Sequence, residues 1–232
     1  MNSTKKTARV AGLLYLLMAT PAPLGLIYVP SKLIARGNAT VTANNILASE
    51  SLFRLGIASE LISATGFIFV ALALYKLLKG VNKGHASLMV TLFVVSVPIS
   101  FLNVVNAIAA LTLVRGADFL SVFNKSQLDA LAMVFLNLHS QGFAVAAIFW
   151  GLWLFPLGLL VYRSGFLPRI LGVLLIVNSL AYPVSSFTSL VLPHYGPIVS
   201  RLIMPLYSGE LWFMLWLLIR GAKDQPLAAA AS

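Results

Sequence analysis

The chain contains no cysteine, which excludes a disulfide framework, a thiolate metal site and a cysteine nucleophile. Charge is also scarce, because Asp, Glu, Lys and Arg make up 9% of the 232 residues, against about a quarter in soluble domains. Hydrophobic residues make up 59% of the chain. This composition excludes an ordinary soluble domain and predicts an all-α, polytopic integral membrane protein with the lipid bilayer as its main partner.

Six apolar stretches are long enough to cross a bilayer, and the clearest is the uncharged run 143–162, FAVAAIFWGLWLFPLGLLVY. As an α-helix this run measures about 30 Å, the thickness of the hydrocarbon core. We expect one six-helix transmembrane domain over residues 10–220, after a basic segment 1–9 and before a flexible tail 221–232. The expected spans are about 10–29, 55–75, 88–114, 134–162, 168–192 and 198–219, with a short helix at the outer surface over about 42–51.

The basic residues predict the orientation of the bundle. The formal net charge is +10, but the basic side chains are spread between the apolar runs instead of forming one face, so we expect no nucleic-acid partner. Lys and Arg accumulate on the cytoplasmic side of membrane proteins. We therefore expect cytoplasmic N- and C-termini in a bacterial cytoplasmic membrane. The basic clusters follow the second span (Lys76, Lys79, Lys83), the fourth (Arg163, Arg169) and the sixth (Arg220, Lys223).

Two stretches leave alternatives open. The basic start and apolar run also fit a secretory signal peptide cut near residues 20–22. The run continues to Val29, which favours a retained first helix bent at Pro21 and Pro23. The fourth helix, expected to start near Gln127 after Ser126, is longer than a bilayer requires, so either its first turns project outside or it breaks near Gly142.

Polar residues inside the spans recur at helical spacing, so each span confines them to one stripe that faces the bundle. By helical rise, most of them fall in the outer half of the membrane. We expect a cavity open to the outside, with Glu210 at its floor. The candidate binding residues are Glu60, Ser63, Asn103, Asn106, His139, Gln141, Asn178, Tyr182, Tyr207 and Glu210.

The two intramembrane acids carry most of the functional prediction, because a carboxylate in a low-dielectric interior is costly without a proton or a partner. Glu60 and Glu210 could carry a proton, bind a cation or catalyse a reaction, or they could only form hydrogen bonds between helices. His139 fits a general base, a metal ligand or a polar group at the membrane surface. The sequence lacks H-x-x-x-H, E-x-x-H, G-x-S-x-G, phosphate-loop and dinucleotide motifs, so we expect no metal site and can name no cofactor.

Several segments resemble a bacterial multi-pass membrane family catalogued as domain of unknown function 4386. They cover nearly the whole chain, and the most specific is IFWGLWLFPLGLLVY followed by SGF-PRILG. Others are ARVAGLLYLL, YVPSKLI, NILASESLFRLGIASELI, LALYKLLKGVN, SVPISFLNVVN, GADFLSVF and GELWFMLWLLIRGAK. The resemblance implies a six-helix membrane protein and transfers no catalytic residue.

Three functions remain open at this stage. The favoured one is binding or translocation of a small molecule, lipid or ion through the polar pocket with buried Glu60 and Glu210. The first alternative is an intramembrane enzyme acting on a lipid or quinone by Glu/His acid-base chemistry. The second is a structural or regulatory membrane partner. The sequence specifies neither the oligomeric state nor an enzymatic reaction.

Overall fold

The computed structural model describes residues 3–223, so most of the predicted tail, residues 224–232, lies outside the described residues. Every regular element in residues 3–223 is helical, and six helical segments are long and apolar enough to cross a membrane, which confirms the all-α six-span fold. The elements are α1 (Ser3–Ala19), η1 (Leu24–Tyr28), α2 (Val29–Leu33), α3 (Ala39–Ala48), α4 (Glu50–Leu78), α5 (Lys83–Arg115), η2 (Asp118–Leu120), α6 (Lys125–Leu152), α7 (Leu154–Arg163), α8 (Arg169–Val191), η3 (Pro193–Tyr195), α9 (Gly196–Ile203), η4 (Met204–Tyr207) and α10 (Ser208–Ile219).

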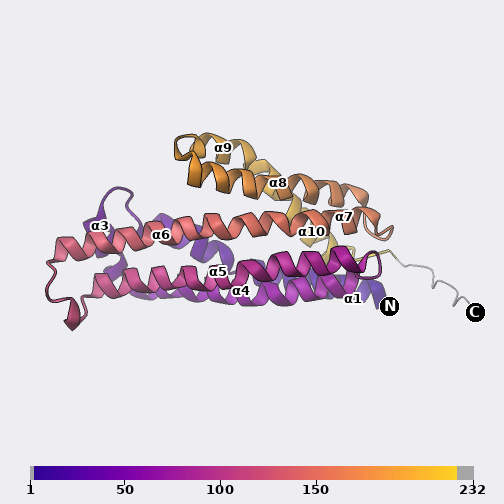
Figure 1. The fold of residues 1–232 in the computed structure, drawn as a ribbon. Coiled ribbons are helices and arrows are strands. Elements are labelled where there is room, and N and C mark those ends of the chain that lie inside the picture. The colour runs from indigo at the N-terminus through magenta and orange to yellow at the C-terminus, as the bar shows by residue number, and fades with distance from the viewer. Residues whose placement is uncertain (1–2, 224–232) are drawn as a thin grey trace, which may run out of the picture.

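The spans run back and forth along one bundle axis (Figure 1). α5 packs against α4, α6 and α7, whereas α8 packs against α6, α7 and α10, and α1 fills the space beside α4 and α10. The N-terminus lies at the end of the bundle where α7 ends, and α3 lies towards the opposite end (Figure 1). We call these two ends the terminal end and the α3 end. Which of them faces the cytoplasm stays a prediction.

Three of the six spans are interrupted, each beside proline. The first span changes from α1 to the π-helical turn η1 after Pro21 and Pro23. α6 continues through Gly142 and gives way to α7 at Trp153, three residues before Pro156. The predicted span 198–219 falls within the candidate span Pro193–Ile219, in which the 3₁₀ segment η4, which contains Pro205, separates α9 from α10. Proline lacks the N–H that would continue the helical ladder, which accounts for these interruptions.

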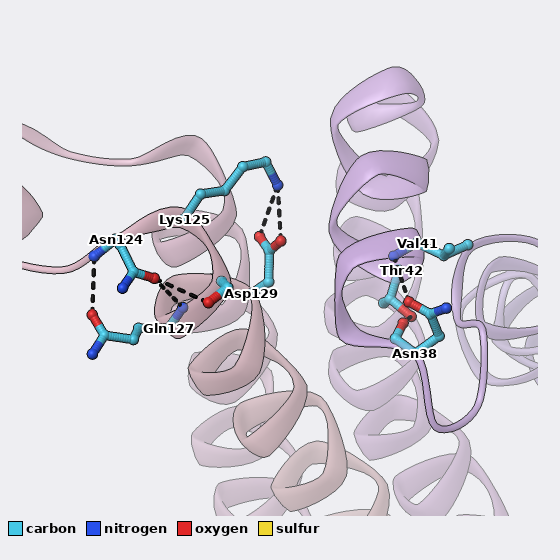
Figure 2. Close-up of polar contacts among 8 residues, drawn as sticks. Asn38, Val41, Thr42, Asn124, Lys125, Gln127 and Asp129 are labelled. Atoms are coloured by element: carbon cyan, nitrogen blue, oxygen red, sulfur yellow. Dashed lines mark hydrogen bonds and ion pairs between the residues drawn. The ribbon is translucent and has the colours of Figure 1, made fainter.

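Asparagine caps fix the starts of two helices at the α3 end (Figure 2). The Asn124 side chain accepts from the Gln127 backbone N–H at 3.0 Å, and the Gln127 side chain accepts from the Asn124 N–H at 3.0 Å. This capping box starts α6 two residues earlier than Ser126 suggests. Asn38 caps α3 in a similar way, by accepting from Val41 at 3.0 Å.

The surface helix predicted over about 42–51 also needs correction, since α3 spans Ala39–Ala48. The backbone departs from helical geometry at Ser49, with φ −133° and ψ 43°, so α4 begins at Glu50. α4, α5 and α6 extend past α8 and α9 towards the α3 end (Figure 1). The first turns of α6 therefore project beyond the shorter helices, while the helix stays intact at Gly142.

Candidate functional site

A cavity of about 180 Å³ lies inside the bundle, and both intramembrane glutamates contribute to its wall. Its lining comes from the first span, α4, α5, α6, α8 and α10, so that distant parts of the sequence meet there. No lysine, arginine or histidine is among the lining residues. These are Ala22, Leu26, Glu60, Ser63, Ala64, Phe67, Phe93, Ser96, Val97, Ser100, Phe143, Trp150, Trp153, Tyr182 and Glu210.

Glu60 is paired with a histidine from α6. His139 Nε2 lies 3.0 Å from Glu60 Oε2, and the two side chains are 13% and 8% exposed. Glu60 lines the cavity, whereas the imidazole is not part of the lining. His139 therefore contacts the carboxyl group of Glu60 from outside the cavity lining. A ligand in the cavity would contact Glu60 and not His139.

The π-helical turn η1 brings the first span close to Glu60. A Cβ on Gly25 would lie 2.7 Å from Glu60 Cγ, 2.8 Å from Ser59 Oγ and 2.9 Å from the Gly56 carbonyl oxygen. Only glycine permits this close approach of the two backbones. π-helical turns are often found at functional sites, and here the turn fixes one side of Glu60.

An asparagine pair holds α5 against α6 next to His139. Asn103 Nδ2 donates to the His139 backbone oxygen at 2.9 Å, and Asn103 Oδ1 accepts from Asn106 Nδ2 at 3.4 Å. The Asn103 amide packs directly on Gly142, where a Cβ would approach Oδ1 to 2.0 Å. Asn103 and Asn106 therefore position the helix that carries His139, and neither is among the residues that line the cavity.

Glu210 is held by two phenols, one from α1 and one from α8. Tyr15 donates to Glu210 Oε1, and Tyr182 donates to Glu210 Oε2 at 3.2 Å. Within residues 3–223, no Lys, Arg or His side chain forms an ion pair with Glu210. The two acids thus differ, because Glu60 has an imidazole partner and Glu210 has only hydroxyl donors.

Tyr15, which donates to Glu210, is a residue that the sequence analysis missed. It is 3% exposed and lies on the same face of α1 as Ala8 and Ala11, which are fully buried. Gly12 lets this helix approach α10 so closely that a Cβ there would lie 2.5 Å from the Leu218 nitrogen. The small residues Ala8, Ala11 and Gly12 at helical spacing mark the packed face and could have identified Tyr15.

Aromatic rings connect the surroundings of the two acids. Along α6, His139 contacts Phe143 with ring centroids 4.8 Å apart, and Phe143 contacts Trp150 at 6.1 Å. Trp150 then contacts Tyr182 at 6.4 Å. A second row contains Tyr15, Phe67, Phe93 and Trp153, with successive centroids 5.3, 5.9 and 5.1 Å apart, and all of these except Tyr15 line the cavity.

A second cavity of about 210 Å³, more open than the first, lies between α6 and α8. It shares Phe143, Trp150 and Tyr182 with the first cavity, so these three rings form the partition between the two. Its other polar lining comes from Tyr207 and from serines at helical spacing on α8. These serines are Ser185, Ser186 and Ser189.

The remaining predicted site residues take different positions. Ser63 lines the first cavity, and its buried hydroxyl has no hydrogen-bond partner in the described chain. Gln141 is exposed on α6. Asn178 is fully buried, its amide has no hydrogen-bond partner among residues 3–223, and it lines neither cavity. In residues 3–223 no three His, Asp or Glu side chains are grouped as metal ligands, so Glu60, His139 and Glu210 do not form such a group.

The fold and the cavity together define a multi-pass α-helical membrane protein with acidic side chains inside its bundle. The chain belongs to the family described as "Domain of unknown function (DUF4386)", whose model matches residues 10–221. It is similar to an uncharacterized protein of Archaeoglobus fulgidus, with 31% identity over 156 residues that make up 67% of this chain and 77% of that protein. No solved structure matches the chain. The family carries no assigned activity, so any functional inference has to come from the geometry.

Proposed function

We propose that this protein binds a small molecule in the cavity between Glu60 and Glu210. The observation that carries the proposal is that these two acids, from α4 and α10, line one cavity. Acids within membrane spans are costly and mark functional pathways more often than structural contacts. A cavity inside a bundle, mostly apolar with a few convergent polar groups, is also the usual form of a ligand site.

The size of the cavity supports the same proposal. A cavity of about 150 Å³ is large enough for benzene, and this one measures about 180 Å³. Leaving 180 Å³ unfilled by side chains forgoes the packing contacts that stabilise a core, which is a cost to the fold. Larger side chains at Ala22 or Ala64 would remove that cost, so an open volume beside two acids favours a role in binding.

Filling the cavity tests the proposal. Ala64 lines the cavity, and its neighbour Thr65 is exposed on the outside of α4. We expect Ala64→Phe to abolish saturable binding of phenyltrimethylammonium and tert-butylbenzene to the purified protein, and Thr65→Phe to leave it intact. Tryptophan fluorescence reports the binding, because Trp150 and Trp153 line the cavity. If neither probe binds saturably to the unchanged protein, the proposal is contradicted.

One observation favours an intramembrane enzyme as a second candidate function. The 3.0 Å contact between His139 and Glu60 joins two groups that exchange protons readily. Because Glu60 faces the cavity, it would be the base that meets a lipid or quinone, and His139 would orient it. Incubation of the protein with membrane lipids and a quinone, followed by mass spectrometry, tests this candidate. A product formed by the unchanged protein and absent with Glu60→Gln would favour the enzyme.

The structural alternative makes a different prediction. If both acids only tie helices together, Glu60→Gln/Glu210→Gln would leave probe binding and the melting temperature nearly unchanged, since an amide also forms hydrogen bonds between helices. We expect this double variant to bind phenyltrimethylammonium more weakly than the unchanged protein does, because both carboxyl groups lie in the cavity wall.

A further inference from the structure

The charged side chains among the described residues that line the cavity are all acidic. Its lining contains two carboxyl groups and no basic side chain. Glu60 already has the imidazole of His139 at 3.0 Å, whereas Glu210 has only the hydroxyl groups of Tyr15 and Tyr182. A carboxylate in a low-dielectric interior needs a proton or a cation. Glu210 is therefore the acid whose counter-ion the described protein does not supply.

The surroundings of Glu210 suit an organic cation better than a metal ion. Calcium takes six to eight oxygen ligands, and magnesium takes about six in strict octahedral geometry. The lining near Glu210 offers few oxygens and is mainly carbon. Aromatic faces attract cations, and the attraction is strongest where water is excluded. Six aromatic side chains line the cavity: Phe67, Phe93, Phe143, Trp150, Trp153 and Tyr182.

We propose that the ligand is a compact organic monocation, such as an alkyl or aryl ammonium ion. This inference rests on the proposed function. The charged group of the ligand binds beside Glu210, and its apolar groups lie against Phe93 and Trp153. The volume of about 180 Å³ limits it to roughly the size of a benzene ring with a few additional atoms. A proton competes with this ligand for the same carboxylate.

A pair of isosteric probes tests the charge requirement directly. Phenyltrimethylammonium and tert-butylbenzene have the same shape and differ in one atom, nitrogen or carbon, and hence in charge. We expect the purified full-length protein to bind the cation at least about tenfold more tightly than the neutral probe, since a factor of ten in affinity needs only about 1.4 kcal/mol. Glu210→Gln should reduce this preference to about twofold or less.

Glu50→Gln is the matched control for that variant. Glu50 pairs with Arg54 at 2.7 Å at the start of α4 and is not part of the cavity wall. The Glu50→Gln variant should keep the full preference for the cation. If Glu210→Gln fails to fold, labelling of the unchanged protein with the hydrophobic reagent dicyclohexylcarbodiimide replaces it. Phenyltrimethylammonium should then protect Glu210 from labelling several-fold, as measured by mass spectrometry of the modified peptide, and tert-butylbenzene should not.

The outcomes separate this inference from the proposed function. Binding of tert-butylbenzene as tight as that of the cation, sensitive to Ala64→Phe, would overturn the cation inference and leave the binding cavity in place. A cation preference that survives Glu210→Gln, or labelling of Glu210 unaffected by the cation, would also overturn the assignment to Glu210. Failure of both probes to bind would contradict the proposed function itself.

Discussion

Replacing Gly142 with alanine tests how closely α5 and α6 must pack beside the Glu60–His139 pair. A Cβ at this position would lie 2.0 Å from Asn103 Oδ1, 2.5 Å from Cγ and 3.1 Å from Nδ2. Carbon contacts are optimal at about 3.5–4.0 Å, so the whole amide would have to move. Asn103 is 4% exposed, and its hydrogen bond to the His139 carbonyl oxygen would be lost.

The expected cost of Gly142→Ala follows from these contacts. Overpacking a tight site costs about 1–3 kcal/mol, and a buried amide that loses its partner costs about 1–3 kcal/mol. The better helix propensity of alanine returns about 0.5–1 kcal/mol. We therefore expect a net loss of about 1–5 kcal/mol in the free energy of unfolding.

Removing the amide should relieve the clash. In Gly142→Ala/Asn103→Ala the new methyl group occupies the space that the amide leaves, so the double variant should be more stable than Gly142→Ala alone. Unfolding in mixed detergent micelles, followed by far-UV circular dichroism, measures the stability of both variants. Gly80→Ala is the control, because a Cβ there would meet no atom within 4 Å. A Gly142→Ala cost below about 0.5 kcal/mol would refute the packing argument, as would a double variant less stable than the single one.

Three further substitutions test the surroundings of the cavity. Tyr15→Phe keeps the ring and removes one donor to Glu210, so the free energy of unfolding should fall by about 1–3 kcal/mol. Asn178→Leu replaces a fully buried amide without partners by an apolar group of the same branching, so stability measured in the same assay should rise by about 1–3 kcal/mol. Gly25→Ala pushes η1 against Glu60, and we expect affinity for phenyltrimethylammonium, measured by tryptophan fluorescence, to fall several-fold.

The sequence was sufficient for the fold class, because a continuous apolar run of bilayer length leaves few alternatives to a membrane helix. Interruptions inside the spans were harder to predict. Pro21 and Pro23 suggested a bend, but they gave no sign of the π-helical turn at Gly25. The segment η4, which contains Pro205, interrupts the last span. Hydropathy does not reveal this interruption, because the apolar composition continues on both sides of it.

The candidate site illustrates a different limit. Helical spacing placed Glu60 and Glu210 on bundle-facing stripes, and both line one cavity in the structure. Spacing within one helix cannot give the partner across a helix interface. His139 lies 79 residues from Glu60, and Tyr15 lies 195 residues from Glu210. Tyr15 was missed because a tyrosine in an apolar run looks like an ordinary packing residue. Its contact with Glu210 depends on the approach of α1 to α10. That these residues form a binding site stays a prediction.

Stability and function make opposite demands on the centre of this bundle. Replacing a buried ion pair by apolar side chains is often neutral or stabilising, so helix association alone does not require Glu60 with His139. Glu210 adds a second acid for which residues 3–223 provide no cationic partner. An open volume of about 180 Å³ lies between these same groups. Selection for helix packing alone would favour apolar side chains in place of the acids and larger side chains in the open volume, and neither change depends on the other. Because both departures from tight apolar packing occur together, binding explains them better than a purely structural role.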